Sequence, residues 1–351
     1  MHLILMGTGT SHGIPVIGCT CAVCTSRNKK DKRYRCSAYL TNRGEEKKYT
    51  HFVPTDIVID TGPEFRIQAL TYKINRLDAV LLTHSHADHL HGLDDLRIFS
   101  FVKPPKGHDI CEPHGQAMQH DNMTQHDTAP QHDTAAVSAG NIALSERNYC
   151  GQDMNPLPIY TNPTAIEDIK YRFAYVFTQA KEGGGKPKLA MNDCTLITPD
   201  NPLVIHSVSI LPVPLLHGSL EDSGWLMSEV QTDGKKHSIA YLTDCSEVPD
   251  SSIKLILENA GILDHLVIDG LREKPHSTHF SFDEALACAE KIGAKHTWFT
   301  HICHNMSHRD IEKYVAMRIS NYPVLDAIVS QGGSVGPAWD GLELTVKPVK
   351  E

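Results

Sequence analysis

Short apolar runs alternate along this chain with segments in which apolar residues recur every three or four positions. The short runs predict strands at residues 2–6, 57–59, 80–83, 203–211, 239–243, 265–268 and 297–301. The longer period predicts helices at residues 64–72, 89–99, 251–259, 281–292 and 308–321. Ser281 with Glu284 three positions later has the spacing of a capping box, which marks a helix start. This alternation predicts an α/β or layered mixed fold.

One segment departs from this order. Gln-His-Asp recurs at residues 119–121, 125–127 and 131–133, within a stretch of low apolar content. Such a stretch cannot bury enough surface to offset its ordering entropy. We therefore expect residues 111–149 to be a solvent-exposed insertion within one domain spanning 1–351. An expanded loop without a role is the favoured reading, and loose metal binding by its His-Asp pairs is the alternative.

Composition limits the classes of function. The chain has 351 residues, 40% of them hydrophobic, and a net charge of −9. This balance supports a real core and argues against a broad nucleic-acid surface. No apolar run reaches the roughly 18 residues of a transmembrane helix, so no membrane association is expected. Residues 1–6 resemble a first strand rather than an export signal. The ten Cys are then expected to be thiols or metal ligands in a reducing cytoplasm.

The strongest chemical signal is the segment Thr83-His84-Ser85-His86-Ala87-Asp88-His89. It follows the apolar run 79–82, so a strand is expected to deliver these ligands to a turn. Imidazole and carboxylate suit Zn²⁺, Mn²⁺ and Fe²⁺. Their density favours two adjacent metals over one. The alternative is a polar loop in a chain that has 22 His.

Three more candidates stand at the ends of apolar runs: His217, Asp244 and His301. Any one alone would more often be an ordinary polar residue where a loop begins. Ligands at strand ends are held rigidly, as a metal site requires. Together with the four residues of the first segment, they form a coherent set.

The order HxHxDH, lone His, lone Asp and last His resembles the metallo-β-lactamase fold superfamily over essentially the whole chain. The resemblance implies an αββα sandwich, in which two mixed sheets are flanked by helices. It also implies a dinuclear site, with His84, His86 and His217 on one metal, Asp88, His89 and His301 on the other, and Asp244 bridging. Asp60 matches a supporting Asp of that family, although a turn-forming Asp before Gly62 is equally compatible.

A second metal site is indicated by the CxCxxC cluster Cys19, Cys21 and Cys24. Three thiolates suit a structural zinc, which needs a fourth N or S ligand. His304 is the natural candidate, and Cys303 and Cys36 are alternatives. Three buried or free thiols remain the other reading.

The Gly-rich segment 7–19, the CxCxxC cluster and the residues 300–304 together resemble the PhnP-like branch of the superfamily, which includes a phosphoribosyl cyclic phosphodiesterase. That resemblance implies a structural zinc on the Cys cluster and His304. It also implies a catalytic role for His279 in assisting the leaving group, alongside Asp88 and Asp244. A His without a chemical role near the start of a helix is the alternative for His279. The 111–149 insertion departs from the pattern.

Three further residues are substrate-binding candidates. Arg272 suits a phosphate oxygen, and a surface salt bridge is as compatible. Ser11 and His12 lie in the Gly-rich segment, which either lines the pocket or only packs.

These features predict a hydrolase that uses two divalent metals, Zn, Mn or Fe, to make water nucleophilic. We expect a phosphodiesterase acting on a small cyclic phosphate or nucleotide-like ester, and a homodimer by resemblance. The alternatives are an RNA-processing nuclease, a lactonase or a thioesterase on the same fold, or a non-catalytic PqqB-like metal or cofactor carrier.

Overall fold

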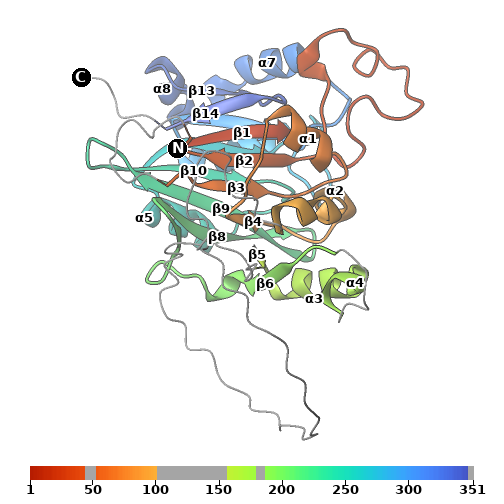
Figure 1. The fold of residues 1–351 in the computed structure, drawn as a ribbon. Coiled ribbons are helices and arrows are strands. Elements are labelled where there is room, and N and C mark those ends of the chain that lie inside the picture. The colour runs from red at the N-terminus through yellow and green to blue at the C-terminus, as the bar shows by residue number, and fades with distance from the viewer. Residues whose placement is uncertain (44–52, 101–155, 179–185, 347–351) are drawn as a thin grey trace, which may run out of the picture.

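A computed structural model describes residues 1–43, 53–100, 156–178 and 186–346. The predicted insertion at residues 111–149 lies outside the described residues, so that prediction stays open. Two seven-stranded sheets form the body of the described chain, and helices lie on their outer faces (Figure 1). The prediction of two mixed sheets flanked by helices is confirmed.

The first sheet is antiparallel at one end and parallel at the other. Its strands are β1 (His2–Gly7), β2 (Ser37–Thr41), β3 (Asp56–Ile59), β4 (Ala79–Leu81), β5 (Leu157–Thr161), β6 (Leu189–Asp193) and β14 (Leu342–Thr345). They are ordered β14-β1-β2-β3-β4-β5-β6. Strands β3 to β6 are parallel to one another, whereas β14, β1, β2 and β3 pair in antiparallel fashion.

The second sheet repeats this plan. Its strands are β7 (Leu203–Ile205), β8 (Val208–His217), β9 (Leu220–Val230), β10 (Lys236–Leu242), β11 (Ile262–Asp269), β12 (His296–Thr300) and β13 (Ser334–Pro337). They are ordered β13-β12-β11-β10-β9-β8-β7, with β10 to β13 parallel and β7 to β10 antiparallel. Because β8 and β10 are both antiparallel to β9, they run in the same direction.

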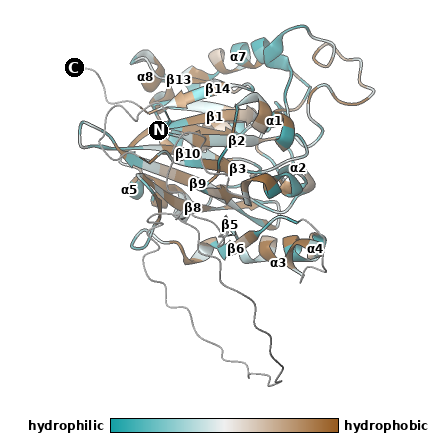
Figure 2. Cartoon of the chain, in the orientation of Figure 1, coloured by the Kyte–Doolittle hydropathy of each residue, from teal (hydrophilic) through white to brown (hydrophobic). Residues whose placement is uncertain are grey.

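The two sheets bury a shared apolar layer between them. Leu3 and Ile59 of the first sheet belong to the same buried cluster as Trp225, Tyr241 and Val267 of the second. Figure 2 shows brown strands in the interior and helices that carry both brown and teal. This burial holds the two sheets face to face, because each large apolar side chain removed from water contributes about 1.5–3 kcal/mol.

Helices cover both outer faces. They are α1 (Phe65–Thr71), α2 (Ala87–Leu90), α3 (Pro163–Arg172), α4 (Ala174–Phe177), α5 (Asp250–Asn259), α6 (Phe282–Ile292), α7 (His308–Ala316) and α8 (Pro323–Ser330). Among the described residues, the 3-10 segments are η1 (Lys29–Asp31), η3 (Leu93–Ser100), η4 (Cys194–Leu196) and η5 (Ile319–Asn321). Buried residues of α1, α2, η3 and α3 pack on the first sheet, and those of α5 to α8 pack on the second.

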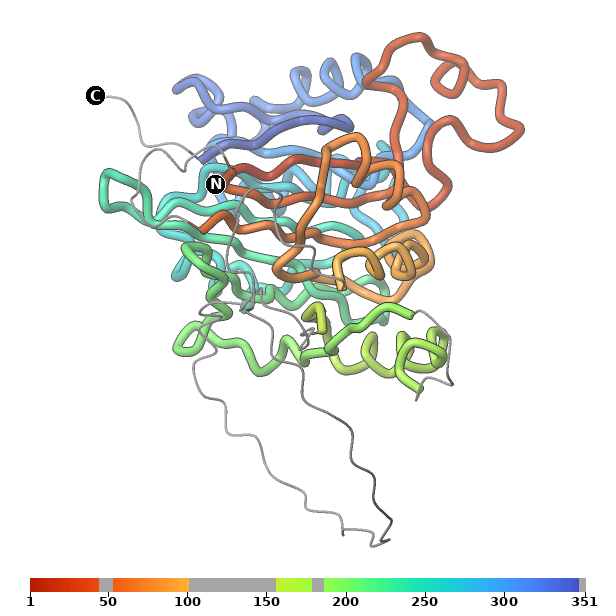
Figure 3. The backbone as a smooth tube through the Cα atoms, in the orientation of Figure 1, coloured from red at the N-terminus to blue at the C-terminus, as the bar shows by residue number. Residues whose placement is uncertain are grey.

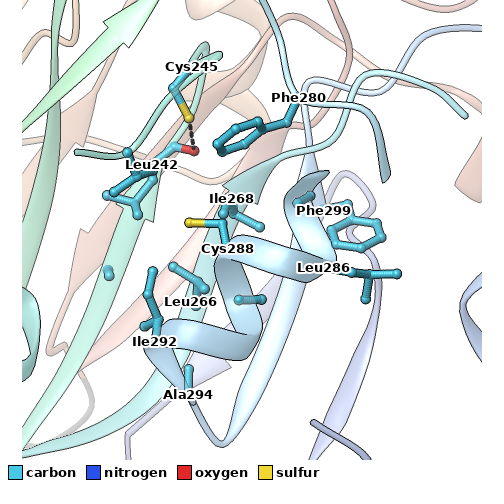
Figure 4. Close-up of a cluster of buried hydrophobic side chains, with 14 of the residues drawn as sticks. Leu242, Cys245, Leu266, Ile268, Phe280, Leu286, Cys288, Ile292, Ala294 and Phe299 are labelled. Carbon is cyan, nitrogen blue, oxygen red and sulfur yellow. Dashed lines mark hydrogen bonds between the residues drawn. The ribbon is translucent and has the colours of Figure 1, made fainter. Parts of the chain in front are cut away.

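Helix α6 shows how sequence and packing agree. The predicted capping box is present: Ser281 accepts from the Glu284 N–H, and Glu284 accepts from the Ser281 N–H. Ile292 then lies beside Leu266 of β11 and Leu286 beside Phe299 of β12, all within one buried cluster (Figure 4). Gly293 ends the helix in the left-handed conformation, at φ 68°.

The chain between β1 and β2 projects from the body of the sandwich as a long loop beyond α7 (dark red in Figure 3). It is anchored at its base by the buried Arg33. The guanidinium of Arg33 donates to Thr8 Oγ1 at 2.7 Å and to the Ala338 carbonyl at 2.6 Å. The N–H of His308, at the start of α7, donates to Asp31 Oδ1 at 2.7 Å. The loop therefore has a fixed position next to α7.

Three predicted elements differ from the structure. Residues 203–211 form two strands, β7 and β8, because His206 turns the chain with φ 53°. The helix expected over 89–99 is divided between α2 and η3 at Gly92, whose Cβ position would lie 2.3 Å from the Gly62 carbonyl oxygen. The helix expected over 308–321 ends at Ala316, and only the short η5 follows. Within the described ranges, no helix has both the length and the apolar character of a membrane span.

Candidate metal centre

The candidate ligands gather where strands of both sheets end. Asp60 follows β3, and the segment from His84 to His89 follows the parallel strand β4. His217 ends β8, Asp244 follows β10 and His301 follows β12. Since these strands of the second sheet run in one direction, their carboxyl ends share an edge. Packing of the two sheets brings this edge to that of β3 and β4.

The first group contains His84, His86 and His217, each of which offers a ligand atom within 4.8 Å of the others. Their ring centroids are 4.5 to 5.5 Å apart. His217 Nδ1 donates to the Thr278 carbonyl at 2.7 Å, and His84 Nδ1 lies 2.9 Å from Thr83 Oγ1. These bonds orient two of the rings and leave their Nε2 atoms available, as in metal-bound histidines.

The second group contains Asp88, His89, Asp244 and His301, whose ligand atoms also lie within 4.8 Å of one another. The two oxygens of Asp244 face different imidazoles, Oδ2 at 3.1 Å from His89 Nε2 and Oδ1 at 3.0 Å from His301 Nε2. Asp244 also forms a group with His217 and His279. This carboxylate therefore lies where the two groups meet, in agreement with the predicted bridging position.

The donor set fits divalent metals. The Nε2 atoms of His84, His89 and His301 are buried and make no well-aligned hydrogen bond within the described chain, although those of His89 and His301 lie 3.0–3.1 Å from the Asp244 oxygens. A buried polar atom without a partner is costly, and a metal would satisfy all three. Burial holds the pKa of His84 well below its usual range and lowers the pKa of His217 to about 4. Both imidazoles are therefore neutral near pH 7, as metal binding requires.

Backbone strain is concentrated in the same place. Asp60, Asp244 and His301 have φ values of 60°, 52° and 56°, in the left-handed region that non-glycine residues rarely adopt. Each conformation costs of order 1–3 kcal/mol and persists only when its surroundings enforce it. Three strained residues in one cluster indicate a functional site.

Asp60 supports the second group without joining it. Its Oδ2 accepts from His89 Nδ1 at 2.7 Å, and its Oδ1 accepts from the Thr83 N–H at 2.9 Å. The carboxylate thus orients one ligand and anchors the strand end that carries the others. Of the two readings of the sequence, this contact favours the supporting role over a simple turn.

Asp269, which ends β11, is a further residue of the site that was not among the predicted ones. Its Oδ2 accepts from His279 Nδ1 at 2.7 Å and from the Cys245 N–H at 2.9 Å. The ring of His279 stacks on that of His301 with centroids 4.4 Å apart. Asp269 follows an apolar run in the same way as Asp244, so the rule used for Asp244 would have found it.

The N-terminal loop holds a second group, Cys19, Cys21, Cys24 and His304. Each of the three sulfurs lies 3.4 Å from His304 Nδ1. A tetrahedral zinc with Zn–S near 2.3 Å and Zn–N near 2.0 Å places these atoms about 3.5 Å apart. The alternatives have other partners, since Cys303 donates to Asn305 and Cys36 to the Gly9 carbonyl. The geometry therefore suits zinc, and the ligand role stays a prediction.

The three substrate-binding candidates lie in two different loops. Ser11 and His12 are exposed in the Gly-rich loop, whose neighbour Thr10 donates its N–H to the Ile302 carbonyl beside His301. Arg272 directs Nε and Nη2 to the carbonyls of Lys274 and Pro275, both at 3.2 Å. These bonds assign Arg272 to holding its own loop, and phosphate binding by any of the three stays a prediction.

A family model described as a beta-lactamase superfamily domain matches residues 55–146 and 140–302. The matched segments contain the candidate ligands of both the first and the second group. This chain belongs to the β-lactamase superfamily. The resemblance seen in the sequence is thereby confirmed.

Two solved structures show which members of the superfamily this chain is similar to. It is 29% identical to a diphosphatase from the PhnP family, with a TM-score of 0.64 over 99% of this chain and 98% of that one. Zn²⁺-bound PqqB from Methylobacterium extorquens shares the fold, at 16% identity and a TM-score of 0.59 over 99% and 100% of the two chains.

An octanoyltransferase of Porphyromonas gingivalis is 28% identical over 337 residues, which are 95% of this chain and 52% of that protein. The superfamily chain thus spans about half the length of this curated relative, and the activity in the relative's name belongs to the longer protein.

Proposed function

We propose that this chain is a dinuclear metal-dependent phosphodiesterase that hydrolyses a small cyclic phosphate or nucleotide-like ester. The observation that carries the proposal is the position of Asp244 between the two groups of candidate ligands, with the His279–Asp269 pair directly beside them. The similarity to a PhnP-family diphosphatase supports attack at phosphorus.

The residues that would hold one metal are His84, His86 and His217, and Asp88, His89 and His301 would hold the other, with Asp244 shared. Bound divalent metals supply Lewis acidity and lower the pKa of water toward neutrality. The Asp60 carboxylate keeps His89 in one tautomer and orientation, and the Thr278 carbonyl does the same for His217. The ligands are therefore preorganised before any metal arrives.

His279 is the residue suited to move a proton. Its Nδ1 is committed to Asp269, which leaves Nε2 to exchange a proton with the leaving oxygen. Burial lowers the pKa of His279 and raises that of Asp269 well above its usual range. The pair acts as an acid when it holds one proton more than a neutral imidazole and a carboxylate: the hydrogen on Nε2 then passes to the leaving oxygen, while Nδ1–H stays bonded to Asp269. A general acid of this kind contributes about 10²–10⁴-fold in rate.

The test is hydrolysis of bis(p-nitrophenyl) phosphate and of a nucleoside cyclic phosphate by the purified chain loaded with Mn²⁺ or Zn²⁺. His86→Ala and Asp244→Ala should each lower kcat/KM by at least about 100-fold, since metal binding supplies several kcal/mol of transition-state stabilisation. His91→Ala is the matched control, because His91 is an exposed histidine of the same segment that belongs to no metal group of the described chain. Full activity in both substituted proteins would refute the proposal.

A further inference from the structure

The loop that joins β11 to α6 is fixed at both ends. Near its start, Arg272 donates to the Lys274 and Pro275 carbonyls. Near its end, the Thr278 carbonyl accepts from His217 Nδ1 at 2.7 Å. The Cβ position of Gly218 would lie 3.0 Å from the Thr278 methyl group, so loop and metal-site strand are in close contact. His276 stands between these anchors.

The hydrogen bonds around His276 determine its tautomer. The Thr278 N–H approaches His276 Nδ1 at 3.4 Å, and Thr278 Oγ1 lies 3.2 Å from the same atom. A backbone N–H can only donate, so Nδ1 of His276 is an acceptor without a hydrogen. In the neutral ring, the hydrogen is therefore on Nε2. Both hydrogen bonds of His276 among the described residues are at Nδ1, and the side chain is exposed, so the Nε2–H is free to meet a ligand.

His276 also continues a row of imidazoles that leads to the metal centre. Its ring centroid lies 5.3 Å from that of His279, and the His279 centroid lies 4.6 Å from His217 and 4.4 Å from His301. Under the proposed function, His279 faces the leaving oxygen. A donor next to His279 is then placed to meet the part of the substrate that departs.

We propose that His276 is a specificity-determining residue, whose Nε2–H donates to an anionic oxygen on the leaving portion of the substrate. This inference rests on the proposed function and extends it to a substrate class. The leaving portion would itself carry a phosphate, as in a nucleotide-like diphosphate. Such a donor distinguishes a leaving phosphate, with its charged oxygens, from a leaving phenolate, which has none at that distance from the reacting phosphorus.

Two amide substitutions distinguish the roles of the two ring nitrogens of His276. In His276→Gln the side-chain amide N–H reaches the position of Nε2, whereas in His276→Asn it reaches only the position of Nδ1. His276→Ala removes both. Ser277→Ala is the matched control, since Ser277 is the exposed neighbour on the same loop.

The experiment measures KM and kcat for ADP-ribose, a diphosphate, and for bis(p-nitrophenyl) phosphate, together with the Kd of ADP-ribose by calorimetry. We expect His276→Ala and His276→Asn to raise KM and Kd for ADP-ribose by about 10–100-fold, the usual loss of one hydrogen bond to a charged group. In the same two variants, KM and kcat for bis(p-nitrophenyl) phosphate should be unchanged. In His276→Gln, these constants should stay within about threefold of the parent for both probes.

Equal losses on both probes, or unchanged ADP-ribose parameters in His276→Ala, would overturn the assignment. Metal content measured in each protein excludes an indirect effect through His217. If the parent protein hydrolysed neither probe, the proposed function would fail. The ratio of ADP-ribose Kd values between His276→Gln and His276→Asn would still decide whether Nε2–H binds the ligand, and a ratio of one would reject it.

Discussion

His89 Nδ1 lies 2.7 Å from Asp60 Oδ2, and neither side chain has any exposed surface. The pair connects a residue outside the metal groups to a residue within one of them. Asp60 also accepts from the Thr83 N–H, so a single carboxylate positions both the ring and the strand end before it. The orientation of the second group therefore depends on a residue that offers no ligand atom itself.

Substitution of Asp60 should weaken metal binding without removing a ligand. Asp60→Asn replaces a charged acceptor by an amide, and loss of such a supporting contact typically costs 10–100-fold in metal affinity or activity. Metal content and Kd by competition with a chelator measure the effect. Asp264→Asn is the matched control, because Asp264 Oδ2 lies 2.7 Å from His237 Nδ1 in a pair outside the metal groups. Equal losses in both variants would contradict this interpretation.

Gly62 allows the segment of Asp88 to approach the end of β3. A Cβ atom at Gly62 would lie 2.2 Å from the Asp88 carbonyl oxygen. This oxygen belongs to the backbone, so it cannot move aside as the end of a flexible side chain could. Gly62→Ala should therefore displace Asp88, cost about 1–3 kcal/mol of stability and lower activity. Gly336→Ala is the control, since nothing lies within 4 Å of its Cβ position. Urea unfolding gives the stability, and a Gly62→Ala protein as stable and active as the control would refute the steric argument.

The cluster of candidate ligands could be largely predicted because these residues follow apolar runs, and local pattern carries that information. Asp244 and His301 were found this way, Asp60 was found through the family resemblance, and Asp269 followed the apolar pattern but was overlooked. The positive φ values of Asp60, Asp244 and His301 could not be predicted, since an Asp or His in the left-handed region has no local signature. The strain depends on contacts from the facing sheet, which the order of residues does not reveal.

The fold class followed from alternating periods, but several strands had no visible pattern. Strand β9 lies between β10 and β8 inside the second sheet and buries polar residues as well as apolar ones, among them Asp222 and Ser228. Ser228 is satisfied by Ser238 of β10 at 2.7 Å. A polar residue in the sequence predicts an exposed position, even where the folded strand buries it with a partner on the next strand. The alternation of apolar and polar residues that predicts a strand is therefore missing from β9. The turn at His206 was missed for a similar reason, as nothing local marks it.

The leaving group should decide how much His279 matters. p-Nitrophenolate departs without a proton, whereas an alkoxide needs one, so His279→Ala should lower kcat by about 10²–10⁴-fold only for the alkyl leaving group. Asp269→Asn should follow the same trend, because it disturbs the hydrogen bond that sets the His279 tautomer. The comparison uses bis(p-nitrophenyl) phosphate and a nucleoside cyclic phosphate. A uniform loss for both substrates would indicate a structural role instead.

The cysteine group should bind one metal independently of the His-Asp centre. Cys21→Ser should release one zinc per chain and lower Tm, because a metal at 1,000 times its Kd contributes about 4 kcal/mol of stability. The N–H of Cys24, aided by His304, lowers the pKa of Cys21 to about 6, which favours the thiolate that zinc requires. Cys288→Ala is the control, as Cys288 belongs to the apolar core around α6. Elemental analysis that showed equal zinc in both proteins would contradict the assignment.

Acid should destabilise the fold through His265, a buried residue of β11 that belongs to no metal group of the described residues. Trp298 Nε1–H donates to His265 Nδ1 at 3.2 Å, so Nδ1 carries no hydrogen, and Nε2 donates to the Thr345 carbonyl at 3.3 Å. A proton on Nδ1 would break the bond from Trp298. Burial lowers the pKa of His265 to about 4, whereas the unfolded chain has an ordinary histidine pKa near 6.5.

The folded state therefore binds the proton less tightly than the unfolded state. The contribution of neutral His265 is fully present above about pH 6.5 and is lost as the pH falls toward 4. A difference of this size corresponds to about 3 kcal/mol. His265→Asn keeps an acceptor near the Nδ1 position and does not titrate, so its unfolding free energy should fall less between pH 7 and 4. Urea denaturation of the two proteins at several pH values measures the difference, and parallel curves would show that His265 does not control acid stability.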